Sequence, residues 1–143
     1  MDNWKAEVEE MLKNREKDRQ AVDGLRAQIL QKEADMIHLT ELGYGQPDAE
    51  EGVPPLRIRK LMDEKRVLEA KVAAKAAHVA QVDRVMASLN GDHQEVLTVF
   101  YCSGLRPTAA VHRLEWRLNV GRSEVYRIKD RAILEFAYRM GRI

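Results

Sequence analysis

The sequence predicts an all-α protein, in which a long helical hairpin or coiled coil is followed by a C-terminal helix-turn-helix domain. Charged residues make up 33% of the 143 residues and aromatic residues 6%, and glycine and proline are few, which favours helices over a sandwich or barrel. Apolar residues recur at steps of three and four over long stretches. Near the C-terminus, Asn119 and Gly121 mark a short turn between two helical patterns. Val120, between them, is the apolar residue that such a turn buries.

The first helical pattern covers residues 4–42. Its apolar positions are Val8, Met11, Val22, Leu25, Ile29, Met36 and Leu39. Charged residues stand at three positions of the stripe where apolar residues would be expected, namely Arg15, Asp18 and Lys32. Charges at such positions weaken a two-stranded coiled coil. We therefore expect a long helix with an interrupted apolar stripe.

Glycine and proline gather in residues 43–55, which predicts a loop. A second helix follows over residues 56–89. Its apolar stripe is more regular and is interrupted only where Lys65 and Lys75 take the place of apolar residues. The apolar positions are Ile58, Leu61, Leu68, Val72, Val79, Val82, Met86 and Leu89. Two long helices joined by a loop pack most simply as an antiparallel hairpin, but the same stripes could pair between subunits. We expect a homo-oligomer, with a dimer favoured.

The last third of the chain predicts three shorter helices. Asn90 and Gly91 end the long helix, and Asp92 with Glu95 matches a capping box that opens a helix over residues 94–103. Gly104 breaks that helix, and a supporting helix runs over residues 107–119. The last helix covers residues 122–140.

The last helix has one apolar and one polar face. Val125, Ile128, Ala132 and Phe136 recur at helical spacing and are predicted to pack inward. The opposite face is predicted to carry Arg122, Tyr126, Arg127 and Lys129, with Arg131 at its edge. Such a face suits insertion into the major groove of DNA, although scattered arginines also occur on solvated helix faces.

Charge is distributed unevenly along the chain. The total is +1, but residues 1–54 hold 7 Lys and Arg against 13 Asp and Glu, residues 55–90 hold 8 against 4, and residues 91–143 hold 9 against 6. We therefore expect residues 1–90 to oligomerise or bind a protein partner, and residues 91–143 to form the DNA-binding domain.

Other classes of function find little support in the residues. The four histidines are far apart and a lone Cys102 completes no zinc motif, so we expect no metal and no cofactor. No phosphate-binding loop or nucleophile motif is present, and we expect no enzymatic activity. The N-terminus lacks the pattern of a signal peptide and no apolar run would span a bilayer, so we expect a cytoplasmic protein with no membrane contact.

The C-terminal 50 residues or so resemble region 4 of the sigma-70-type factors. The resemblance rests on Glu95-Val96-Leu97 through Tyr101, Gly104-Leu105, and Leu118-x-Val120-x-Arg122-x-x-Val125-x-x-Ile128-x-x-Arg131-Ala132-Ile133. The whole layout resembles the small phage and prophage transcriptional regulators of the RinA and ArpU type. In two places the chain departs from the sigma pattern: Glu115 and Trp116 are bulkier than usual for the supporting helix, and Gly121 replaces a Ser or Thr cap.

The resemblance implies a bacterial host cell, a role at late or packaging genes, and a set of DNA contacts. The positions that match base-contacting residues are Arg122, Ser123, Tyr126 and Arg127, while Lys129, Arg131 and Thr108 are expected to contact phosphates. The leading interpretation is a sequence-specific regulator that activates late genes, with RNA polymerase as a possible partner. The alternatives are a DNA-packaging protein similar to a small terminase subunit and a coiled-coil adaptor that does not bind DNA.

Overall fold

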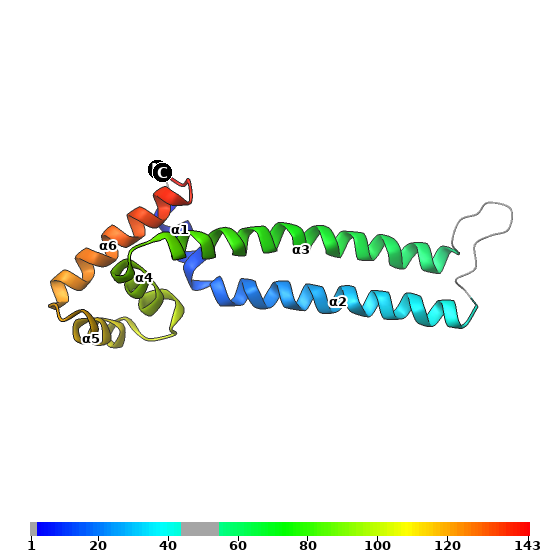
Figure 1. The fold of residues 1–143 in the computed structure, drawn as a ribbon, viewed down its shortest axis with the longest axis horizontal. Coiled ribbons are helices and arrows are strands. Elements are labelled where there is room, and N and C mark those ends of the chain that lie inside the picture. Colours follow the sequence, from blue (N-terminus) through cyan, green and yellow to red (C-terminus); the bar gives the residue numbers. More distant parts are fainter. Residues whose placement is uncertain (1–2, 44–54) are drawn as a thin grey trace. The chain divides into compact units, whose positions relative to one another are not determined.

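The computed structural model describes residues 3–43 and 55–143, and these residues are helical almost throughout (Figure 1). The segments are α1 (Trp4–Lys13), α2 (Arg15–Glu41), α3 (Leu56–Ser88), α4 (Gly91–Leu97), the π-helical η1 (Thr98–Cys102), α5 (Pro107–Leu118) and α6 (Arg122–Arg139). No strand occurs in the described residues, so the predicted all-α class is confirmed. None of their helices is long and apolar enough to cross a membrane.

The chain divides into two compact units. Unit 1 combines the N-terminal residues up to Asp18 with His78–Ile143, and unit 2 is the described part of Arg19–Ala77. The sequence had placed the domain boundary after residue 90. In the structure both ends of the predicted hairpin belong instead to the C-terminal unit, because their apolar residues are buried there.

Unit 2 is an antiparallel pair of helices, α2 and α3 (Figure 1). Val22, Ile58 and Leu68 are its buried apolar residues. Charged residues predicted to interrupt the stripe form ion pairs across the hairpin: Lys32 Nζ lies 2.7 Å from Glu64 Oε2, and Lys65 Nζ lies 3.1 Å from Glu33 Oε1. The interruptions are therefore compensated by opposite charge. Residues 44–54, most of the predicted loop, lie outside the described residues.

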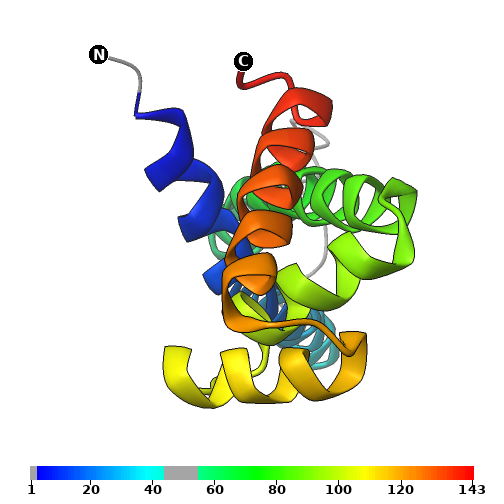
Figure 2. The same ribbon diagram turned by 90° about the vertical axis from the view of Figure 1, so that its left-hand side faces the viewer.

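Unit 1 is organised around α6. Figure 2 shows α6 with α1 on one side and α4 on the other, while α5 crosses the start of α6. Its larger cluster of buried residues, here called the α1–α6 core, joins α1, the end of α3, α4 and the C-terminal half of α6. The members are Val8, Leu12, Val82, Met86, Leu89, Leu97, Ala132, Ile133, Phe136, Ala137 and Met140.

A smaller cluster, here called the turn core, lies around the start of α6. It consists of Val96, Val99, Ala110, Val111, Leu114 and Val125. The two clusters share α4 and α6, since Val96 belongs to one and Leu97 to the other. The C-terminal half of α6 thus packs with α1 and the end of α3, the N-terminal half packs with η1 and α5, and α4 contributes to both clusters.

Two local predictions need correction. The first helix is interrupted at Asn14, whose side-chain amide donates to Glu10 Oε1 at 3.1 Å, so α1 and α2 replace one long helix. The cap of α4 is Asn90, whose side-chain oxygen accepts from the backbone N–H of His93 at 2.9 Å, and not Asp92. Asp92 instead lies in the first turn, because the helix begins at Gly91.

Arg15, also predicted to interrupt the apolar stripe, is held by an ion pair within unit 1. Its Nε donates to Asp83 Oδ1 at 2.8 Å, which links the start of α2 to α3. Cys102 is exposed. Its thiol, at the end of η1, donates to the backbone carbonyl of Leu12 in α1 at 3.5 Å.

Replacing Leu12 by Ala should destabilise unit 1, because Leu12 is fully buried in the α1–α6 core. Removing a buried Leu side chain costs about 2 to 5 kcal/mol of unfolding free energy. Urea unfolding followed by tryptophan fluorescence measures this, since both Trp4 and Trp116 belong to unit 1. Leu134→Ala on the exposed side of α6 is the matched control and should cost about 1 kcal/mol or less. Equal stability of the two variants would contradict the role of α1 in this core.

Candidate nucleic-acid interface

The turn between α5 and α6 begins at Asn119, where the sequence predicted that the backbone needs unusual freedom. Asn119 ends α5 in the left-handed conformation, with φ 54° and ψ 49°. Asn tolerates this region better than most residues, because its short polar side chain can bond locally. The backbone N–H of Val120 then donates to the carbonyl of Glu115 at 3.3 Å, and α6 begins two residues later.

Gly121 has a different role from the one predicted. Its φ is −80°, which any residue can adopt, and a side chain there would meet no atom within 4 Å. Gly121 is the N-cap residue of α6, as the comparison with the sigma pattern implied. The turn therefore needs the backbone freedom of Asn119 and not that of Gly121.

Trp116 of the supporting helix does not disturb the packing of that helix on α6. The face of α5 that meets the turn core carries Ala110, Val111 and Leu114. Trp116 lies on the opposite face and is 85% exposed. The departure noted in the sequence at Trp116 therefore has no consequence for the contact between the two helices.

The exposed face of α6 is here called the α6 outer face. It contains Ser123, Arg127 and Arg131 from the predicted site, together with Asp130, Leu134 and Tyr138, and all six are exposed. Leu134 and Tyr138 were not predicted as site residues. Their spacing of seven and eleven residues from Arg127 places them on the same side of the helix, and this spacing is the signal that could have identified them.

Lys129 and Tyr126 do not lie on that outer face, which corrects the predicted assignment. The Lys129 ammonium lies over three aromatic rings, at 4.7 Å from the Phe100 centroid, 5.6 Å from Tyr101 and 5.8 Å from Tyr126. The Tyr126 ring in turn lies 6.0 Å from the Phe100 ring. The two residues thus fasten α6 to η1, because a cation is attracted to the faces of aromatic rings.

The remaining predicted residues lie in the first turns of α5 and α6 or on the α6 outer face. Arg122 is exposed in the first turn of α6, and its guanidinium carbon lies 5.9 Å from the Tyr126 ring centroid. Thr108 is exposed in the first turn of α5. Arg127 forms an ion pair with Glu124 at 3.2 Å, and the two side chains are 63% and 39% exposed. Such a surface pair contributes little, so the Arg127 guanidinium can exchange it for another acceptor.

Tyr101 supports the packing around Lys129 in a neutral form. Burial raises the pKa of its phenol, and the carboxylates of Glu9 and Asp130 raise it further. Glu9 acts on the phenol mainly as a nearby charge, because the Tyr101 hydroxyl is buried without a completed hydrogen bond. The aromatic cluster around Lys129 therefore keeps an uncharged phenol at physiological pH.

Side-chain contacts of His93 and Arg117 join α4 to α6 and to α5. His93 Nδ1 on α4 lies 2.7 Å from Glu135 Oε2 on α6, and Arg139 contacts the other oxygen of Glu135 at 3.1 Å. Arg117 on α5 pairs with Glu95 on α4, the residue that the capping box would have used. In the described ranges no three His, Cys, Asp or Glu side chains gather as metal ligands.

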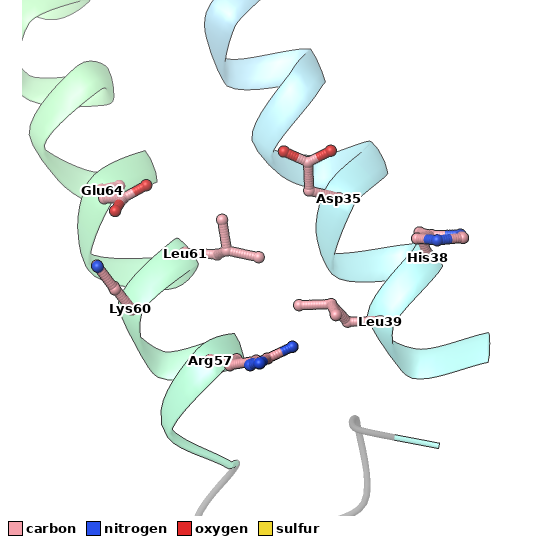
Figure 3. Close-up of a pocket in the computed structure, with 7 residues that line it drawn as sticks. All are labelled: Asp35, His38, Leu39, Arg57, Lys60, Leu61 and Glu64. Atoms are coloured by element: carbon pink, nitrogen blue, oxygen red, sulfur yellow. The ribbon is translucent and has the colours of Figure 1, made fainter. Parts of the chain in front are cut away.

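Unit 2 contains a hollow of about 410 Å³ between α2 and α3 (Figure 3). Leu39 and Leu61 point toward each other across it, with Arg57 beside them. Glu64 at its edge is bound to Lys32; their hydrogen bond lowers the pKa of the Glu64 carboxyl and raises that of the Lys32 amine. The residues around this hollow carry charges of both signs, which indicates no particular class of ligand. We therefore do not assign a binding site to it.

Comparison with known protein families, with characterised proteins and with solved structures finds no match to this chain.

Lys129→Met should reduce the stability of unit 1 by about 0.5 to 2 kcal/mol, because it removes the charge over the three rings and keeps much of the side-chain volume. Urea unfolding by tryptophan fluorescence measures the loss. Arg131→Met, which removes an exposed charge two residues further along α6, is the control and should change stability by less than about 0.5 kcal/mol. If both variants behave alike, Lys129 is not a packing residue.

Proposed function

We propose that this protein binds double-stranded DNA in a sequence-specific manner through α5 and α6 and regulates transcription of phage or prophage genes. The observation that carries the proposal is the arrangement of α6. Buried residues hold its inner face from Val125 to Ala137, while Arg127 and Arg131 extend outward directly after a tight helix-helix turn. A helix fixed in this way can enter the major groove without losing its support.

The chemistry of the α6 outer face suits base contact. Arg donates two parallel hydrogen bonds to the O6 and N7 atoms of guanine, which discriminates against the wrong base by roughly 1 to 3 kcal/mol. Arg131, which the resemblance assigned to a phosphate contact, lies one helical turn after Arg127 on this face, so the two would reach neighbouring base pairs. Arg122, Ser123 and Thr108 at the helix starts are available for the backbone or for the edge of the site.

The regulatory role rests on the resemblance of residues 95–133 to sigma region 4 and of the whole layout to RinA-type and ArpU-type regulators. In this proposal the protein is a cytoplasmic activator of late genes in a bacterial host cell, and RNA polymerase is its protein partner. The acidic N-terminal third of the chain suits a protein contact better than a DNA contact, because it would repel phosphate.

A packaging role is the second candidate, and one observation favours it. Both helices of unit 2 carry apolar residues on faces that no part of unit 2 covers, as expected of a protein that assembles into larger rings. Mapping the protein on its own phage or prophage genome separates the two roles. A footprint upstream of late genes supports regulation, and one at the packaging start supports the second candidate.

Arg127→Ala should relax the preference at one base pair of the selected site, because it removes one set of guanine contacts. Selection from random duplexes, followed by titration of the preferred duplex, measures the loss, expected at about 1 to 3 kcal/mol or roughly 5- to 150-fold in Kd. Arg84→Ala is the matched control, since Arg84 is exposed in the same unit but lies on α3. Equal losses in both variants would indicate a general charge effect.

The salt dependence of binding tests the DNA interface as a whole. Affinity for mixed duplex DNA should reach the micromolar range near 50 mM salt and fall linearly on a double-logarithmic plot, with a slope of about 0.9 per neutralised phosphate. Arg122→Ala should flatten this slope by about 1 if it contacts a phosphate. Absence of measurable binding at low salt would favour the adaptor that does not bind DNA.

A further inference from the structure

Unit 2 has two exposed faces that are covered by no other part of the unit. On α2, Ala27, Leu30, Ala34 and Ile37 follow steps of three and four, and Leu30 and Ile37 are 65% and 60% exposed. These residues, with Asp23, Arg26 and Glu41 beside them, are here called the outer face of α2. They lie away from the ion pairs that join α2 to α3.

The outer face of α3 has the same spacing. Val67, which is 55% exposed, is followed at steps of three and four by Ala70, Ala74 and Ala77, all of which are exposed. This outer face also includes Leu56, Arg59, Lys60, Asp63, Arg66 and Lys71. Steps of three and four with small and apolar residues are the pattern by which one helix packs along another.

The hairpin by itself buries little. Among the described residues of unit 2, the buried apolar side chains are Val22, Ile58 and Leu68, a small core for two helices of this length. Helices gain most of their stability in proteins from packing of an apolar face, so an unpacked second stripe on each helix favours a further helical neighbour.

The charges on the two outer faces are complementary. The outer face of α2 holds Asp23 and Glu41 against Arg26. The outer face of α3 holds Arg59, Lys60, Arg66 and Lys71 against Asp63. One face is therefore acidic and the other basic, which fits contact between the two different faces better than contact of either face with itself.

The register of the hairpin places the two stripes level with each other. Lys32 pairs with Glu64 and Glu33 with Lys65. Counting outward from these pairs along the antiparallel helices, Leu30 is level with Val67 and Ala27 with Ala70. Two copies that stand side by side in the same direction would therefore bring stripe against stripe. They would also bring Asp23 within one helical turn of Lys71 of the neighbour, and Glu41 within one turn of Arg59.

We propose that copies of this chain associate head to tail, with the outer face of α2 in one copy packed on the outer face of α3 in the next. The contact repeats the antiparallel α2–α3 packing already present within each copy. Because the two faces differ, a copy that uses one still presents the other, so the contact generates a closed ring or an open row of copies and not a self-limiting dimer.

Disulfide capture tests the contact in the full chain. In a Cys102→Ser background, chains with Ala27→Cys and chains with Ala70→Cys should each remain uncrosslinked alone, and mild oxidation of the mixture should give disulfide-linked pairs of unlike chains. A chain with both substitutions should give a ladder of linked copies. Mixing Ala34→Cys with Ala70→Cys is the control, since these positions are two turns out of register, about 10 Å along the helix.

Sedimentation of the unlinked chain gives an independent measurement. The mass should rise with protein concentration, and Leu30→Glu should lower the association constant by about tenfold or more, because it places a charge within the apolar stripe. Efficient crosslinking of the Ala27→Cys chain with itself would overturn the proposal in favour of a two-fold contact, and a single-chain mass at all concentrations would overturn association altogether. No DNA is present in either assay, so the result does not depend on DNA binding by unit 1.

Discussion

The position of α6 depends on one constraint, the burial of its C-terminal half in the α1–α6 core. Phe136 and Ala137 are fully buried against residues from α1 and from the end of α3, which lie far away in sequence. The N-terminal half is held separately by the turn core and by the contact of Lys129 with three rings. A helix fixed at both ends leaves its outer face free for a partner without loss of packing.

Charge has separate roles in the two units. In unit 2 it compensates interruptions of the apolar stripe, since Lys32 and Lys65 lie opposite Glu64 and Glu33. In unit 1 the cations of α6 divide between a packing role, for Lys129, and an outward-facing role, for Arg127 and Arg131. The net charge of the whole chain is close to zero, but the charges are unevenly placed. The exposed face of α6 is basic, and the outer faces of α2 and α3 carry opposite net charges.

The two proposals reinforce each other without depending on each other. A single α6 outer face with two arginines would bind DNA modestly, because affinity for DNA grows with the number of phosphates neutralised. Head-to-tail association would present several such faces together, and linked sites bind more tightly than one site when the geometry permits simultaneous contact. The number of copies in the assembly would also bear on the choice between regulation and packaging.

Local sequence determined the helices, the break at Gly104, the left-handed turn at Asn119 and the start of α6, because each depends on residues close together in the chain. Only the tertiary structure decided which neighbours the apolar stripes meet. Periodicity marks Val8 and Met11 as residues of an apolar face, but it did not select Leu12, and it cannot show that this face packs on α6 and not on the hairpin. For the same reason the sequence placed Lys129 outside, since the rings of Phe100 and Tyr101 that attract it come from another helix.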